Sequence, residues 1–159
     1  MSNQRTIRAS MLSSYNDCPR RAVARQYKKE IEKHGYALNN YIASIGAAVG
    51  TATHKYVENY YIARLQEMEF KNPIDEVMVS LENEINTGVL WDDTTTNKDV
   101  AKMQIERMST AHIEAIGKHI NPIATEIALT SDFDKNWRIT GHIDLLCKDE
   151  TRNKGFLQI

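Results

Sequence analysis

The chain has 159 residues, of which 42% are apolar and 26% are charged, and its net charge is -1. This length and this balance are typical of one soluble globular domain with a core of its own. No apolar run approaches the roughly 20 residues that span a bilayer, and residues 1–10 lack the apolar segment of a secretory signal, so we expect a cytoplasmic protein rather than a membrane or secreted one.

The charge is unevenly distributed along the chain. Residues 1–37 carry eight Lys and Arg side chains against three acids, a net charge of +5, so the remainder sums to -6. A basic segment on a nearly neutral protein points to a phosphate-bearing partner. A solvated helix face is the ordinary alternative, and composition does not separate the two.

The first part of the chain has helical spacing. Ser10 is expected to begin a helix, because apolar residues follow it three and four apart. Pro19 should break this helix near Asp17 or Cys18. A second, basic helix is predicted from Arg20 to about Lys33, and His34-Gly35 should end it.

Three longer helices are predicted next. A loop should lead into a helix rich in small residues that continues to about Phe70. Pro73 can open the next helix at its first turn, and Thr87-Gly88 should stop it. After the polar loop 91–99, a long helix is expected from about Lys98 to His119.

The pattern then changes to that of strands. Residues 123–129 alternate roughly by two, 131–136 form a turn, and 137–147 make a second strand, so the two fit a hairpin. Residues 155–159 would start a third strand, and a chain that ends on an apolar strand is expected to be incomplete there.

The expected fold class is therefore α+β, with N-terminal helices followed by an antiparallel β meander. We treat residues 1–159 as a single domain. Residues 1–120 are expected to be mainly helical, and residues 121–159 to supply the strands of the core.

One acid lies inside the second predicted strand. Asp144 is surrounded by the strand formers Ile139, Ile143, Leu145 and Leu146. Burying an ionised carboxylate there is costly unless a cation or several donors meet it, so Asp144 is a candidate metal or catalytic ligand. An acid at an exposed strand end is the competing interpretation.

Four features in order resemble one nuclease family. They are LSSYNDCPRRAVARQY at 12–27, GTATHKYVENY at 50–60, Glu126 on the first strand, and GHID at 141–144 followed by the strand GFLQI. This series is similar to the PD-(D/E)XK nuclease superfamily, in its RecB-like and phage exonuclease branch. The resemblance implies a restriction-endonuclease-like core and a bacterial or phage-infected host cell as the setting.

The resemblance implies a metal site that hydrolyses phosphodiester bonds in DNA. Asp144 would be the central ligand of Mg²⁺ or Mn²⁺, and His54 and Glu126 would join it as ligands and catalytic residues. An imidazole ligand suits Mn²⁺ at least as well as Mg²⁺. His54 as a packed or exposed histidine and Glu126 as an exposed strand residue are the ordinary alternatives.

The same resemblance implies a nucleic-acid surface on the basic segment. Arg20, Arg21 and Arg25 would contact DNA phosphates, which supply affinity without sequence preference. Ordinary surface ion pairs are the alternative for these arginines. Some relatives are tethered to helicases or act in recombination and repair, so such a partner is also expected.

The chain departs from the family pattern in two respects. The D/E-x-K motif that completes the site would fall just past Ile159, so we expect this chain alone to be weakly active or inactive. Some relatives hold an iron–sulfur cluster through four cysteines. Cys18 matches the first, but Cys147 does not match the others, so a cluster is possible only in a longer parent chain. Otherwise Cys18 is expected to be a small buried side chain.

Three functions therefore remain in competition. The first is part of a metal-dependent DNA nuclease, of exonuclease or recombination and repair type. The second is a non-catalytic, nuclease-like module that binds DNA or a protein partner. The third is a helical interaction protein with accidental motif matches, which predicts that Asp144 lies more than about 8 Å from both His54 and Glu126, because ligands of one ion each lie within roughly 2–2.6 Å of it.

Overall fold

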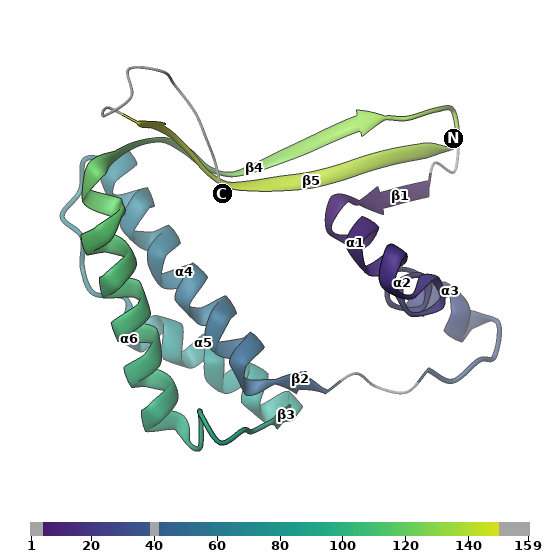
Figure 1. Cartoon of the computed structure of the whole chain (residues 1–159), viewed down its shortest axis with the longest axis horizontal. Helices are drawn as coiled ribbons and strands as arrows, with labels where there is room; N and C mark the ends of the chain where they lie inside the picture. Colours follow the sequence, from purple (N-terminus) through teal and green to yellow (C-terminus); the bar gives the residue numbers. More distant parts are fainter. Residues whose placement is uncertain (1–4, 39–41, 150–159) are drawn as a thin grey trace. The chain divides into compact units, whose positions relative to one another are not determined.

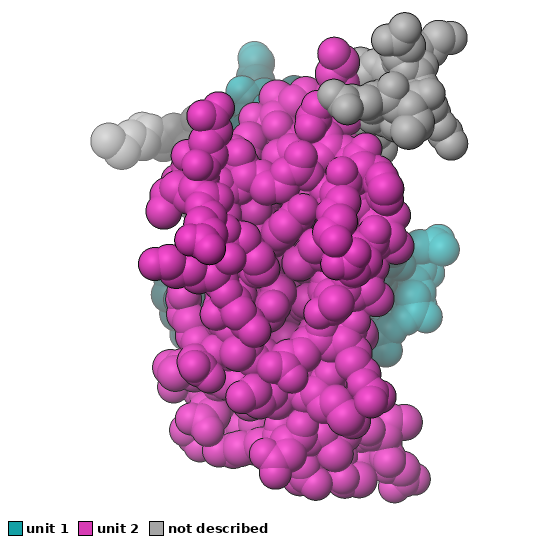
Figure 2. Space-filling model, turned by 90° about the vertical axis from the view of Figure 1, so that its left-hand side faces the viewer, with its two compact units in different colours: residues 1–40, 126–143 teal, residues 41–125, 144–159 magenta. Residues whose placement is uncertain are grey.

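The computed structural model describes residues 5–38 and 42–149 (Figure 1). The chain forms two compact units, which Figure 2 distinguishes by colour. Unit 1 consists of residues 1–40 and 126–143, and unit 2 consists of residues 41–125 and 144–159. The single domain expected from chain length stays a prediction.

The helices of unit 1 are interrupted at Cys18, where the sequence predicts a break before Pro19. The helices are α1 (Ala9–Asp17), α2 (Pro19–Gln26) and α3 (Lys28–Lys33). Pro19 occupies the start of α2, where its missing N–H costs nothing, so the predicted division is confirmed. The predicted cap at Ser10 is wrong, because α1 begins at Ala9 and Arg8 precedes it without a side-chain cap.

The sheet is mixed. Strand β4 (Ile120–Asp132) and strand β5 (Trp137–Asp149) are neighbours joined by the short connection 133–136, and β1 (Arg5–Arg8) pairs in parallel with β5. The α+β class is thus confirmed. The parallel edge strand β1 comes in addition to the predicted strands. The predicted strand at 155–159 lies outside the described residues.

Two side chains attach β1 to the helices of unit 1. The Gln26 amide Nε2 donates to the carbonyl oxygen of Thr6 at 3.3 Å, and the Tyr27 hydroxyl lies 3.4 Å from the same oxygen. The guanidinium of Arg5 lies over the ring of Trp137 on β5, 5.4 Å from its centre. These contacts explain how a four-residue strand with a polar sequence holds its place at the sheet edge.

Unit 2 is built around three helices. They are α4 (Ile45–Leu65), α5 (Ile74–Thr87) and α6 (Lys98–Ala115), followed by the 3-10 helix η1 (Gly117–His119). Their shared core includes the fully buried side chains of Ile45, Leu81 and Ile105. Burial of such side chains contributes roughly 1.5–3 kcal/mol each, so this core is the main support of α4.

Local signals set the ends of these helices. The hydroxyl of Ser44 accepts from the N–H of Ala47 at the start of α4, and the Asn97 side chain accepts from Val100 at the start of α6. Gly88 follows α5 with a φ of 99°, which glycine adopts without strain. The parallel pair β2 (Ala43–Ser44) and β3 (Val89–Leu90) was not predicted, because two residues show no strand periodicity.

A single arginine ties the end of α4 to the start of β4. The Arg64 Nη1 donates to the carbonyl oxygens of Gly117 and Ile120, the second at 2.7 Å, and Nη2 donates to the Asn121 side chain at 3.3 Å. Charged donors give strong hydrogen bonds. The turn from helix η1 into β4 is therefore fastened to α4. No helix in the described ranges combines the length and the hydropathy of a membrane span.

Candidate functional site

His54 lies on the side of α4 that faces away from the core. Ala48, Val49, Ala52 and Tyr56 are the buried residues on either side of it along the helix, whereas the His54 side chain is 46% exposed. Helical spacing thus divides α4 into a packed face and a face that carries His54 in contact with solvent.

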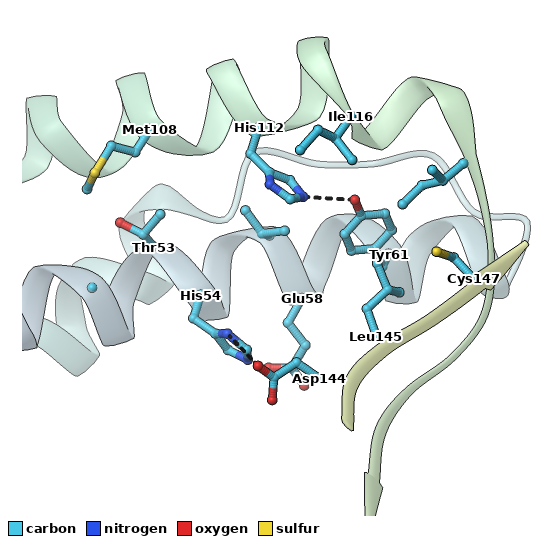
Figure 3. A pocket seen from close by; sticks show the side chains of 13 residues that line it. Thr53, His54, Glu58, Tyr61, Met108, His112, Ile116, Asp144, Leu145 and Cys147 are labelled. Carbon is cyan, nitrogen blue, oxygen red and sulfur yellow. Dashed lines mark hydrogen bonds and ion pairs between the residues drawn. The ribbon is translucent and has the colours of Figure 1, made fainter. Parts of the chain in front are cut away.

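Asp144 on β5 approaches His54. Its Oδ2 lies 3.9 Å from Nδ1 of His54, and Figure 3 shows the two side chains pointing toward each other. Ligand atoms bound to one ion at roughly 2.0–2.6 Å can lie about this far apart. The Asp144 side chain is 50% exposed, so of the two interpretations of this acid the exposed one applies to its burial. Water already solvates this charge, and a cation can reach it directly.

A cavity of about 550 Å³ extends from this pair. Its wall comes from α4, from α6 and the residues after it, and from β5, and it is mainly apolar. Thr53, His54, Glu58 and Asp144 supply the polar part of the lining. A pair of potential metal ligands therefore borders a space large enough for an organic ligand.

A hydrogen-bonded pair lines the same cavity. The Tyr61 Oη lies 2.9 Å from Nε2 of His112, and Tyr61 is only 2% exposed. Burial raises the pKa of Tyr61 to about 12 and lowers the pKa of His112 below its ordinary value. Both side chains are therefore neutral at neutral pH. Tyr61 shares a helix face with His54 in the sequence, whereas no pattern signalled His112, which comes from α6.

Glu58 lies one helical turn after His54 and also lines the cavity. Its carboxylate accepts from Lys55 Nζ at 2.8 Å, and its side chain is only 15% exposed. Glu58 follows His54 by four residues in the sequence, so helical spacing places the two on one face of α4. The ion pair of Lys55 and Glu58 therefore lies on the same helix as the candidate ligand His54.

A family model matches residues 6–159, and its description is the PD-(D/E)XK nuclease superfamily. The chain belongs to this superfamily. No curated protein matches it. Membership supports a nuclease-like function with DNA as the substrate, and it fits the use of divalent metal ions. The interpretation as a helical protein with accidental motif matches is thereby excluded, as the 3.9 Å approach of His54 to Asp144 also indicates.

Glu126, the third ligand predicted from the PD-(D/E)XK resemblance, lies on the part of β4 that belongs to unit 1. It is exposed, and its backbone has a φ of 52°, a left-handed conformation that is uncommon for a residue with a side chain. Such strain concentrates at functional positions. Its role as a ligand stays a prediction.

The predicted DNA-binding arginines of this superfamily member all lie on α2 in unit 1. Arg20, Arg21 and Arg25 are exposed there. Arg21 forms an ion pair with Asp17, one helical turn earlier in the chain. A surface ion pair is the alternative to a DNA contact that the sequence left open for this residue. Exposed pairs of this kind contribute about 0–1 kcal/mol, so the pair does not prevent Arg21 from turning to a phosphate.

The two cysteines are free thiols. Cys18 follows α1 and is only half-buried, so its expected burial is wrong, whereas Cys147 on β5 is 8% exposed and lines the cavity. Cys18 separates two helices and so stays near the surface. An iron–sulfur cluster in a longer parent chain stays a prediction.

Proposed function

We propose that this protein is part of a metal-dependent DNA nuclease, of exonuclease or recombination and repair type, in the RecB-like branch of its superfamily. The approach of His54 to Asp144 at the edge of a cavity carries this proposal, in a chain that belongs to a nuclease superfamily. A helicase or recombination protein is the partner that fits this branch.

Asp144 would hold the metal ion, with His54 beside it and Glu126 as a third ligand. A divalent ion supplies neutralisation of developing phosphate charge and a water of lowered pKa. A carboxylate with an imidazole suits Mn²⁺ as well as Mg²⁺. Glu58 brings a second carboxylate to the same wall, and Lys55 neutralises it at 2.8 Å, so Asp144 remains the central ligand of this proposal.

The basic helix α2 supports a role in DNA binding. Arg20 and Arg25 project from it as exposed cations, and Arg5 and Arg8 on β1 add positive charge to unit 1. Contacts from such side chains to phosphates supply affinity that falls as salt rises. This surface would hold the substrate strand irrespective of its sequence.

The alternative is a nuclease-like module that binds DNA or a protein without cleaving. One observation favours it: the exposed arginines of α2 can hold DNA phosphates whether or not a metal ion is bound. In that case the chain binds metal and DNA but does not cleave.

Metal binding is the experiment that tests the proposed site. Isothermal titration with Mn²⁺ should show one site in the unmodified chain. Asp144→Asn and His54→Gln should each weaken it at least tenfold, because each removes a ligand. Asp93→Asn and His119→Gln are matched controls at exposed positions and should leave the affinity unchanged.

Cleavage is measured in parallel on end-labelled DNA with Mg²⁺ or Mn²⁺. Metal-dependent cleavage that Asp144→Asn abolishes supports the nuclease, and metal-dependent DNA binding without cleavage supports the module. Mn²⁺ affinity that is the same in Asp144→Asn and in the Asp93→Asn control would refute the assignment of Asp144.

A further inference from the structure

The cavity beside His54 and Asp144 has more room than a metal ion needs. Its volume of about 550 Å³ falls within the roughly 300–1,000 Å³ of cavities that hold small organic ligands. Figure 3 shows His54 and Asp144 together on one part of the wall, with Met108, His112 and Ile116 carried by the helix opposite. A ligand of this cavity needs a charged group at one end and a larger body at the other.

The part of the wall that comes from α6 and the residue after it exposes large apolar side chains. Met108 is 44% exposed and Ile116, directly after α6, is 43% exposed, and both line the cavity. Apolar side chains that converge on a concave surface are characteristic of a ligand site. An inorganic phosphate or a sugar would leave this apolar surface in contact with water.

A polar pair is set into this apolar wall. Tyr61 and His112 bond each other at 2.9 Å. The phenol oxygen can take part in a second hydrogen bond, and the imidazole has a second nitrogen. An acyl chain would offer no partner to this remaining hydrogen-bonding capacity. A flat heterocycle with apolar faces and a polar edge satisfies both parts of the wall.

We propose that this cavity binds the base of a nucleotide whose phosphate lies at His54 and Asp144. The inference rests on the proposed function, which places the phosphate, and it adds what the substrate must be. A base inside a duplex is stacked and paired, so only an unpaired base at a strand end, or one extruded from the helix, can enter. The preferred substrate is therefore a single strand or a frayed end.

The test compares two probes that share a phosphate. Isothermal titration in the presence of Mn²⁺ measures thymidine 5′-monophosphate and 2-deoxyribose 5-phosphate, which lacks the base. Burial of one base against the apolar side chains of the wall should make the nucleotide bind about tenfold more tightly. Mn²⁺ affinity is measured first in every variant, so that a failed metal site and a failed base site give different results.

Two methionines on α6 provide a matched pair of variants. Met108→Trp places a larger side chain in the cavity and should remove the preference for the nucleotide while leaving Mn²⁺ affinity unchanged. Met103→Trp is the control, since Met103 is 41% exposed on the same helix but outside the cavity lining, and it should keep the tenfold preference. If circular dichroism shows that Met108→Trp is unfolded, Ile116→Trp takes its place.

The possible outcomes are distinct. Equal affinity of the unmodified chain for the two probes, or a preference that survives both Met108→Trp and Ile116→Trp, overturns the base site and leaves the metal site standing. A preference for the nucleotide without Mn²⁺ binding supports the base site and overturns the proposed function. Self-association that Met108→Trp alone abolishes would show that a second copy of the chain covers the cavity, which also overturns the inference.

Discussion

Removing the hydroxyl of Tyr61 is the perturbation whose size follows most directly from the structure. In Tyr61→Phe the ring contacts with Tyr60 and His112, at 5.2 and 5.9 Å between centres, are retained. The change therefore removes only the 2.9 Å hydrogen bond to His112. A net hydrogen bond is worth about 1 kcal/mol, and His112 is only half-buried, so water in the cavity can replace the lost partner.

We therefore expect Tyr61→Phe to destabilise the protein by about 1 kcal/mol. For a chain of this length that corresponds to a fall in Tm of roughly 2–4 °C, measured by circular dichroism. Tyr36→Phe is the matched control, because Tyr36 is 68% exposed, and its Tm should not change.

A double-mutant cycle separates the hydrogen bond from other effects. Combining Tyr61→Phe with His112→Leu should reveal a coupling of about 1 kcal/mol, since the two variants remove the same bond. Additive changes in stability, or a Tm for Tyr61→Phe equal to that of the unmodified chain, would refute the reasoning.

Three further predictions concern protonation, backbone strain and salt. Burial lowers the pKa of His112, so the unfolded chain binds more protons below about pH 6.5 and stability should fall as the pH drops from there. Thermal melts from pH 7.5 to 5.5 should show a smaller fall for His112→Leu, and an equal fall would contradict this cause. Glu126 has a φ of 52°, a strain of about 1 kcal/mol that glycine does not have, so Glu126→Gly should raise Tm by roughly 2–4 °C. Glu126→Ala keeps the strain and should not raise Tm. Equal Tm values for the two variants would argue against strain at this position. Replacing both Arg20 and Arg25 by Ala should reduce the slope of log affinity for duplex DNA against log salt by about 1.8, or 0.9 for each lost phosphate contact. Arg107→Ala, an exposed change on α6, is its control, and an unchanged slope in the double variant would exclude the phosphate role.

The helices could be predicted because their signals are local. Pro19 divides α1 from α2, Gly88 follows α5, and both act through the conformation of a single residue. The strands β4 and β5 were also predicted, each two or more residues shorter than observed. Periodicity identifies an element well and its ends less well, because fraying and pairing depend on neighbours elsewhere in the chain.

Features that depend on distant partners could not be predicted in this way. The parallel pairing of β1 with β5 joins residues 5–8 to residues 137–140, and a strand of four residues carries no sign of so distant a partner. His112 meets Tyr61 across 51 residues, so neither local sequence reveals the bond. The burial of Asp144 was left open between two interpretations, because apolar neighbours indicate a strand but not the depth at which each side chain lies.

The contacts of Arg64 have a consequence for how the cavity keeps its shape. This guanidinium sits in the last turn of the helix that carries His54, and it holds the carbonyl oxygens of Gly117 and Ile120. Ile120 belongs to the cavity wall, so one cation couples that wall to the helix bearing the candidate ligand. A substitution at Arg64, which touches neither His54 nor Asp144, can therefore alter the width of the cavity, because it changes the hydrogen bonds that fix Gly117 and Ile120 to α4.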